Sequence, residues 1–255
     1  MIIYEKEGRI AIITINRPEA LGVISLEGFR ELNDALINFR DDDDLWVGII
    51  TSTGNKAFSC GVDINEVLPF IKGAGTKLLH QPITKVLRGL GLDLWKPLIA
   101  ALNGLTLGGG FALALRCDIR IASENVKLGF PEVRVGMLGG TQRLPRLIPY
   151  GIAVEMIFTG KMIDAQEAYR IGLLNKVVPL DRLLPAAKEM AESICEAGPL
   201  AVRASKEAMV RGMSMSLEEG ERLEMSLTPP VVNSRDFEEG IKAFTEKRKP
   251  KFEGR

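Results

Sequence analysis

The segment that decides the fold is residues 103–113, NGLTLGGGFAL, in which three consecutive glycines precede a predicted helix. It lies within an uncharged apolar run, residues 97–115, whose length is close to that of a membrane span. The run contains Pro97, Asn103, Thr106 and four glycines, which make a continuous helix unfavourable. We therefore predict a buried strand, a glycine turn and the start of a buried helix, and no membrane segment.

Two other segments share this small-residue character. Residues 58–64, FSCGVDI, follow a predicted strand, and residues 128–132, LGFPE, are followed by residues 139–144, GGTQRL. A small-residue turn in front of a helix exposes backbone N–H groups where the helix dipole favours negative charge. Two such turns facing one point would form an oxyanion hole. The same glycines could instead serve only tight turns and close packing, so both interpretations stay open on this pattern alone.

Strands alternate with helical patterns through the first part of the chain. Apolar and β-branched residues predict strands at residues 9–15, 46–51, 97–101 and 119–122. Ser25 is a predicted N-cap for a helix whose buried face carries Phe29, Leu32, Leu36 and Phe39. This alternation indicates an α/β layered core.

The pattern becomes helical toward the C-terminus. Residues 173–178 form a predicted short strand, and the helical pattern that follows is broken at Gly198-Pro199 and at Pro229-Pro230. We therefore predict two parts, with residues 1–195 as the α/β core and residues 196–255 as a helical C-terminal region.

The composition excludes several classes of function. The 33 Lys and Arg residues balance 33 Asp and Glu residues, and a net charge of zero argues against a basic nucleic-acid footprint. His80 is the only histidine, which rules out multi-histidine metal sites, and we predict no metal. Cys60, Cys117 and Cys195 form no CxxC pair, which favours a reducing, cytoplasmic setting without disulfides. Acid–base chemistry is therefore expected from a carboxylate.

Motifs of other enzyme classes are missing from the sequence. It has no GxxxxGKS or GxxxxGKT phosphate loop, no GxGxxG at a strand–helix junction and no GxSxG nucleophile elbow. Charged residues interrupt residues 1–16, which therefore do not resemble a secretory signal. His80 is predicted to be a surface or helix-packing residue, and Cys60 lacks a recognisable base that would make it a nucleophile.

Together, these segments resemble the enoyl-CoA hydratase/isomerase (crotonase) superfamily, and the resemblance runs from residues 16–18, NRP, to residues 239–252. It implies an α/β fold with a spiral of ββα units in residues 1–195. It also implies that C-terminal helices, in residues 196–255, support a homotrimer or homohexamer. The implied ligand is an acyl-CoA thioester, with no separate cofactor because coenzyme A is part of the substrate. Neither a nucleic acid nor a membrane is expected as a partner.

The resemblance also assigns the site. It implies that the backbone N–H groups of Cys60 and Gly109 bind the thioester carbonyl oxygen and that Glu132 is the catalytic acid–base residue. Negative charge builds on this oxygen as an enolate forms, and each fixed amide would stabilise it by about 3–4 kcal/mol. The residues implied to contact the substrate or its coenzyme A group are Ser59, Val62, Asp63, Ile64, Gly108, Ala112 and Pro131.

Two departures from the family pattern affect the reaction and not the fold. Typical hydratases of the family carry a second glutamate where this sequence has Ala112, so Glu132 is the only one of the two acids present. The loop of residues 135–140 is shorter than usual, and in the family this loop lines the acyl pocket. Of the other acidic residues, Asp118 is predicted to make structural hydrogen bonds, and Asp63 is predicted to have a helix-start role as well.

Three functions follow from the resemblance. The leading hypothesis is an acyl-CoA lyase that adds water to a 2-enoyl-CoA, with Glu132 as its single acid–base residue. The alternative is a Δ3–Δ2-enoyl-CoA isomerase, because one carboxylate suffices to move a proton between two carbons. The third is a non-catalytic or RNA-binding member of the superfamily, although a net charge of zero provides no basic face for phosphate contacts.

Overall fold

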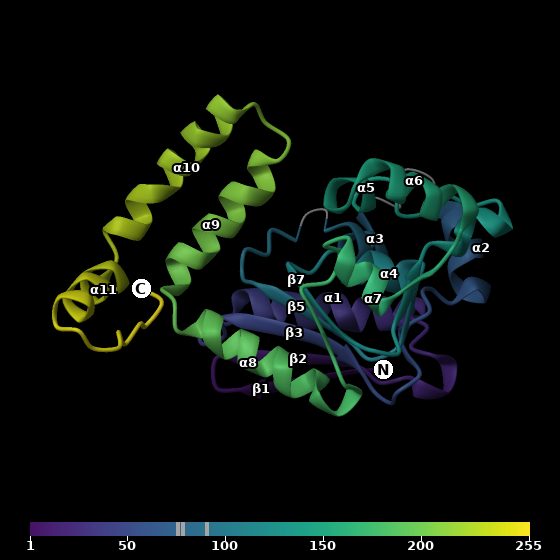
Figure 1. Cartoon of the computed structure of the whole chain (residues 1–255), viewed down its shortest axis with the longest axis horizontal. Coiled ribbons are helices and arrows are strands. Elements are labelled where there is room, and N and C mark those ends of the chain that lie inside the picture. Colours follow the sequence, from purple (N-terminus) through teal and green to yellow (C-terminus); the bar gives the residue numbers. More distant parts are fainter. Residues whose placement is uncertain (75–76, 78–79, 90–91) are drawn as a thin grey trace.

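A computed structural model describes residues 1–74, 77, 80–89 and 92–255 (Figure 1). The described strands form two sheets. The larger sheet has the order β1-β2-β3-β5-β7-β10 and is parallel except for the β1–β2 pair. Its strands are β1 (Ile2–Glu7), β2 (Ile10–Ile15), β3 (Val47–Ser52), β5 (Leu98–Leu102), β7 (Ile119–Ser123) and β10 (Lys176–Val178). The smaller sheet consists, in order, of β4 (Ala57–Ser59), β6 (Leu105–Leu107), β8 (Lys127–Gly129) and β9 (Ile163–Asp164).

Successive strand pairs supply the two sheets alternately. The first strand of each pair, β3, β5 or β7, joins the larger sheet, and the second, β4, β6 or β8, joins the smaller sheet. Helical segments follow each pair, namely α2 (Ile64–Ala74) and α3 (Pro82–Arg88), then α4 (Gly109–Ala114), then η3 (Pro131–Val135), α5 (Leu144–Leu147) and α6 (Tyr150–Thr159). This repetition confirms the predicted spiral of ββα units. Because β4, β6 and β8 are parallel, their C-terminal ends lie at one edge of the smaller sheet.

Helix α1 (Leu26–Asp41) has the capped, one-faced structure that the sequence predicts. The hydroxyl of Ser25 accepts a hydrogen bond from the N–H of Gly28 at 3.1 Å and so caps the first turn. The predicted face is buried, and each side chain on it contributes about 1.5–3 kcal/mol by leaving water. The fully buried members of this face are Phe29, Leu32, Leu36 and Phe39.

The apolar run of residues 97–115 contains two strands, β5 and β6, where one was predicted. The turn between them holds Asn103, whose side-chain amide donates to the carbonyl oxygen of Ser52 at 3.0 Å. A Cβ atom on Gly104 would lie 2.3 Å from the carbonyl oxygen of Lys56, so only glycine permits this turn. Within the described ranges, the helices are too short or too polar to cross a bilayer.

The C-terminal helices form an arm that projects from the core (Figure 1). After α7 (Ala165–Arg170) and η4 (Leu180–Arg182), helix α8 (Leu183–Cys195) packs on β3 and β5. Pro199 is the first residue of the next helix, which confirms the predicted break at Gly198-Pro199 because proline suits a first helical position. The helices of the arm are α9 (Pro199–Gly212), α10 (Leu217–Val232) and α11 (Arg235–Thr245).

The predicted break at Pro229-Pro230 is wrong, because α10 continues through both prolines to Val232. A proline inside a helix removes an N–H donor and so one hydrogen bond, but only two residues of the helix, Val231 and Val232, follow these prolines. The hydroxyls of Ser226 and Thr228 also donate to carbonyl oxygens of the preceding turn, at 2.6 and 2.9 Å. The helix therefore ends after the prolines and not at them.

Candidate active site

Three turns meet at the edge of the smaller sheet where β4, β6 and β8 end. The turn after β4 begins at Cys60, the turn after β6 contains Gly108, and the segment after β8 leads to Glu132. The first two turns touch, since a Cβ atom on Gly61 would lie 3.2 Å from the backbone nitrogen of Gly109. The fold therefore brings together the three small-residue segments that carry the family resemblance.

Small residues make this close approach possible. A Cβ atom on Gly110 would lie 2.1 Å from the carbonyl oxygen of Ser59, so α4 reaches the end of β4 only because residue 110 has no side chain. Ser59 is fully buried, and its hydroxyl donates to the carbonyl oxygen of Gly22 at 2.7 Å and accepts from the N–H of Gly61 at 3.2 Å. Ser59 therefore holds the turn in place, and its prediction as a substrate contact is wrong.

The available amide in the first turn belongs to Val62 and not to Cys60. The N–H of Cys60 donates to the carbonyl oxygen of Leu21 at 3.0 Å, so its prediction as an oxyanion donor is wrong. The carbonyl oxygen of Gly61 accepts a backbone hydrogen bond, at 2.9 Å, from the segment that leads into α1. In a trans peptide unit the N–H points away from the carbonyl, so the N–H of Val62 points to the other side. Val62 packs beside Gly109, where a Cβ atom would lie 3.0 Å from its Cγ1.

The second turn consists of Gly108 and Gly109. Gly108 has φ 53° and ψ −122°, which favours glycine, and its N–H donates to the carbonyl oxygen of Gly129 at 3.0 Å. The carbonyl oxygen of Gly108 accepts from the N–H of Ala112 at 2.8 Å and so opens α4. The N–H of Gly109, in the same peptide unit, therefore points away from the helix and has no acceptor within it. The turns thus present the N–H groups of Val62 and Gly109 next to each other.

Glu132 lies in η3, and its carboxyl packs against the backbone of two glycines. A Cβ atom on Gly108 would lie 2.9 Å from Oε1 of Glu132, and one on Gly139 would lie 2.7 Å from Cδ. Oε2 is buried and has no hydrogen-bond partner in the described part of the chain. Burial raises the pKa of Glu132 above its usual value, because the charged form loses hydration. A carboxyl with a raised pKa is suited to accept and return a proton near neutral pH.

Three further predicted contact residues lie around these turns. Ala112 is half-buried and one helical turn beyond Gly108, so both residues are on the same side of α4. Ile64 is the first residue of α2 and is 61% exposed, which leaves its side chain accessible to a ligand. Pro131 is half-buried at the start of η3. A longer side chain at residue 112 would therefore extend from the side of α4 on which Gly108 lies.

Two acidic residues make the structural contacts predicted for them. Asp63 accepts a hydrogen bond from the N–H of Asn65 at 3.2 Å, at the start of α2. Asp118 accepts from the N–H of Leu98 at 2.7 Å and forms an ion pair with Lys206 at 2.8 Å. Lys206 belongs to α9, so Asp118 ties the arm to the larger sheet.

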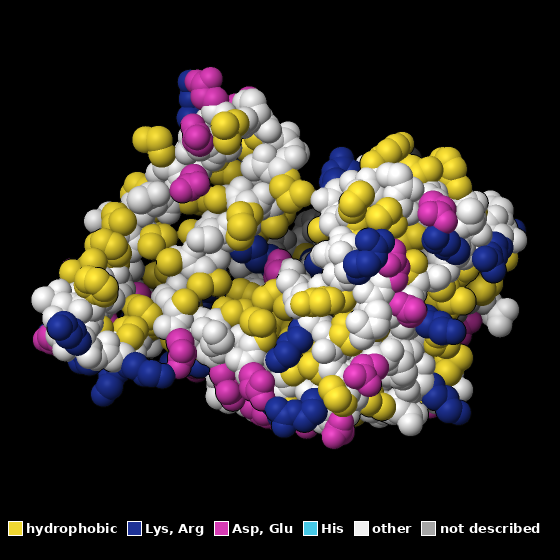
Figure 2. Space-filling model, in the orientation of Figure 1, with side chains coloured by type: hydrophobic (Ala, Val, Ile, Leu, Met, Phe, Trp, Pro, Cys, Tyr) yellow, Lys and Arg dark blue, Asp and Glu magenta, His cyan; other side chains and the backbone are white. Residues whose placement is uncertain are grey.

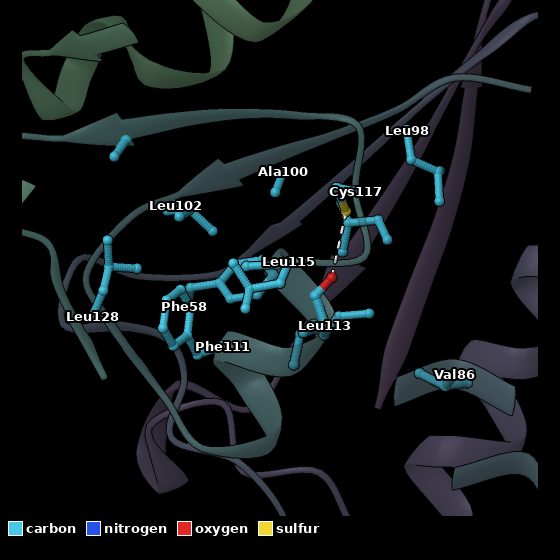
Figure 3. Close-up of a cluster of buried hydrophobic side chains, with 14 of the residues drawn as sticks. Phe58, Val86, Leu98, Ala100, Leu102, Phe111, Leu113, Leu115, Cys117 and Leu128 are labelled. Atoms are coloured by element: carbon cyan, nitrogen blue, oxygen red, sulfur yellow. Dashed lines mark hydrogen bonds between the residues drawn. The ribbon is translucent and has the colours of Figure 1, made fainter. Parts of the chain in front are cut away.

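Within the described residues, the histidine and the cysteines do not form a second site. His80 is exposed, as predicted for a surface residue. Cys117 is buried in the hydrophobic core, with its Sγ 3.7 Å from the carbonyl oxygen of Leu113 (Figure 3). Burial raises the pKa of the Cys117 thiol to about 12 and also raises that of Cys60, which disfavours the nucleophilic thiolate. Across the described residues, no three His, Cys, Asp or Glu side chains are grouped to hold a metal ion.

Gly139 is the residue of this site that the sequence analysis does not identify. It belongs to the GGTQRL segment, which contributes to the family resemblance without indicating a role for either glycine. A pair of glycines is equally compatible with a flexible turn, so the sequence carries no sign that one of them covers a carboxyl.

A spiral of strand pairs that holds a half-buried carboxyl beside two main-chain amides is an α/β architecture suited to acid–base chemistry. The family model described as enoyl-CoA hydratase/isomerase matches residues 5–255, and the chain belongs to this family. The predicted family membership is thereby confirmed.

Similar proteins agree with this assignment over nearly the whole chain. This chain is 42% identical over 253 residues to the short-chain-enoyl-CoA hydratase of Clostridium acetobutylicum. The match covers 97% of this chain and 95% of that protein. This chain is also 41% identical over 256 residues to the crotonyl-CoA hydratase of Syntrophomonas wolfei, covering 98% and 97%. The crystal structure of an enoyl-CoA hydratase from Bacillus anthracis matches with a TM-score of 0.90 and 37% identity, covering 100% of this chain and 99% of that chain.

Proposed function

We propose that this enzyme adds water to the double bond of a 2-enoyl-CoA, with Glu132 as its single acid–base residue. The observation that carries the proposal is the contact between the Glu132 carboxyl and Gly108, the residue directly before the Gly109 amide. A proton-transfer group therefore stands next to donors for the thioester oxygen. The hydratase names of the similar proteins support the same reaction.

The proposed reaction uses both parts of the site. The N–H groups of Val62 and Gly109 donate hydrogen bonds to the thioester carbonyl oxygen and draw electron density from the conjugated double bond. Water attacks the β-carbon while the Glu132 carboxylate takes one of its protons, and the electron pair of the double bond moves to form the enolate. The protonated carboxyl then returns a proton to the α-carbon. Each amide stabilises the enolate oxygen by about 3–4 kcal/mol.

The substrate proposed for the site is an acyl-CoA, and no separate cofactor is required because coenzyme A is the carrier of the acyl group. We place the coenzyme A portion along residues 60–64, which connect the Val62 amide to the exposed Ile64. The acyl group then extends past Ala112 and Pro131 toward Glu132. Asp63 supports this segment from the start of α2 through its hydrogen bond to Asn65.

The alternative reaction, Δ3–Δ2-enoyl-CoA isomerisation, is favoured by one observation, the methyl group of Ala112 on the α4 face that a second carboxylate would occupy. Assays of the purified enzyme on crotonyl-CoA and on a 3-enoyl-CoA distinguish the two reactions. We expect hydration of crotonyl-CoA, followed by loss of the absorbance of the conjugated thioester, to have the higher kcat/KM. Isomerisation of the 3-enoyl-CoA without hydration of crotonyl-CoA would assign the enzyme to the isomerases instead.

We further propose that residues 196–255 assemble the chain into a homotrimer or homohexamer. Apolar side chains are exposed along the arm, where Figure 2 shows hydrophobic groups over α9 to α11. Such a surface is typical of a protein–protein contact. The most exposed of these side chains are Met209, Met213, Leu217, Met225 and Phe244.

Light scattering coupled to size exclusion tests this assembly. We expect a mass three or six times that of the 27.9 kDa chain, and a shift to smaller species in Met225→Glu. Met225 is 74% exposed in the single chain, so the substitution should leave the chain folded. Leu180→Glu is the matched control, because it places the same charge on an exposed apolar residue outside the helical arm. A wild-type enzyme that is monomeric at micromolar concentration would contradict the proposal.

We infer a cytoplasmic location from the cysteines. All three, Cys60, Cys117 and Cys195, are free thiols. Free thiols together with the absence of any disulfide between them are typical of proteins kept in a reducing compartment.

A further inference from the structure

The carboxyl of Glu132 occupies a slot between two glycine backbones that come from different loops. On one side, a Cβ atom on Gly108 would lie 2.9 Å from Oε1. On the other side, a Cβ atom on Gly139 would lie 2.7 Å from Cδ, 2.8 Å from Oε1 and 3.0 Å from Oε2. Real Cβ atoms essentially never lie within 3.0 Å of another non-bonded heavy atom, so a side chain on either glycine and the present position of the carboxyl exclude each other.

The two glycines differ in what their backbone requires. Gly108 has a positive φ and would favour glycine whatever its neighbours are. Gly139 is not among the residues with positive φ, so its φ does not itself require glycine. Its neighbour Gly140 has φ 69°, and a Cβ atom there would lie 2.3 Å from the ring of Phe130. The backbone conformation and core packing therefore explain why residue 140 is glycine. The glycine at residue 139 is explained by the Glu132 carboxyl alone.

We propose that Gly139 is a positioning residue for the reaction. Because residue 139 has no side chain, the Glu132 carboxyl has room to lie against the Gly108 turn. This inference rests on the proposed function. The carboxyl is the end of a flexible side chain, whereas the Gly108 backbone is held by hydrogen bonds to Gly129 and Ala112. Gly139 is half-buried and follows an exposed segment, residues 134–138. A methyl group at residue 139 would therefore displace the carboxyl from the Gly108 turn. The carboxyl would leave the place where it can reach a water molecule beside the enolate.

The substitution Gly139→Ala tests this role. We expect kcat on crotonyl-CoA to fall by about 10²-fold, because a displacement of about 1 Å has that effect on a reacting group, with little change in KM. The displaced carboxyl would meet more water, so the acid limb of the pH–rate profile should move to lower pH. Gly151→Ala is the matched control, since no atom lies within 4 Å of a Cβ atom there and its φ is not positive. We expect it to leave kcat and the profile unchanged.

A double-mutant cycle separates positioning from a general loss of structure. Glu132→Asp withdraws the carboxyl by one methylene and opens the slot, so adding Gly139→Ala to it should change the residual kcat by less than about two-fold. Equal losses from Gly139→Ala in both backgrounds would overturn the proposal. So would an unchanged kcat and pH profile in the single Gly139→Ala variant.

A readout independent of turnover completes the test. Titration of ¹³C-labelled glutamate carboxyls, with the Glu132 signal assigned by its loss in Glu132→Gln, should show a lower pKa for Glu132 in Gly139→Ala. An unchanged titration would contradict the inference. The failure of the positioning role of Gly139 can be distinguished from the failure of the proposed function. If Glu132→Gln is inactive but Gly139→Ala behaves as wild type, only the positioning role falls, whereas a fully active Glu132→Gln removes the proposed function.

Discussion

Glu132→Gln is expected to lower kcat for the hydration of crotonyl-CoA by about 10²–10⁴-fold, the range that a positioned acid–base group contributes. Glutamine keeps the size and shape of the side chain but cannot take a proton from water. Ala112 offers no second carboxylate on the adjacent face of α4, so another residue cannot assume the role. Steady-state kinetics should show the loss in kcat, with KM close to that of the wild type because the coenzyme A contacts remain.

The same carboxyl should set the pH dependence of the wild-type enzyme. Water attack requires the carboxylate form, so activity falls as the pH falls through the pKa of Glu132. Burial raises this pKa, and the acid limb should therefore lie above the 4.5 of an ordinary glutamate. The residual activity of Glu132→Gln should lack this limb. Glu124→Gln, an exposed glutamate after β7, is the control and should leave both rate and profile unchanged. Wild-type activity in Glu132→Gln would refute the mechanism.

Gly109→Pro is expected to lower kcat by about 10²–10³-fold, the usual effect of deleting one oxyanion donor. Proline has no backbone N–H, and it is accepted at the first position of a helix, which is where Gly109 stands in α4. The variant should therefore lose the donor and keep the helix. The proline Cδ takes the place of the amide hydrogen and faces the thioester oxygen, so KM should rise while kcat falls.

Gly109→Ala is the matched control for the proline variant. Both substitutions add a Cβ atom that meets Cγ1 of Val62 at 3.0 Å, but alanine keeps the N–H group. We expect alanine to cost much less activity than proline, and thermal unfolding should show both variants folded. Equal losses in the two variants would mean that crowding against Val62, and not the missing amide, causes the effect.

The sequence predicts those parts of the fold that a long periodic pattern defines. The buried face of α1, from Phe29 to Phe39, is an example, because its apolar spacing extends over several turns. The strands of the smaller sheet are harder to predict, since β4, β6 and β8 have three residues each, too few to define a periodic pattern. Strand β1 is also missing from the prediction, because half of its residues, IIYEKE, are charged and most are exposed at the edge of the larger sheet. Its pairing with β2 is a tertiary contact that local sequence does not encode.

The site shows the same division between composition and geometry. The three glycine-bearing segments and Glu132 are recognisable from sequence, and the structure brings them together. The choice between Cys60 and Val62 as the donor cannot be recognised from sequence. It depends on which peptide groups face Leu21 and the segment entering α1. Those partners are distant in sequence from the turn. Gly139 is hidden for a related reason, since its importance lies in the space it leaves for Glu132 and not in any group that it provides.

The two kinds of catalytic group in this site differ in how evolution can alter them. The proposed oxyanion donors are main-chain N–H groups at the ends of strands, which every residue except proline supplies. Exchange of the side chain at Val62 would therefore leave both proposed donors in place. The proposed proton transfer, in contrast, depends on the side chain at a single position, Glu132. The same main-chain turns could therefore serve a different reaction after the exchange of one or two side chains, at residues 112 and 132.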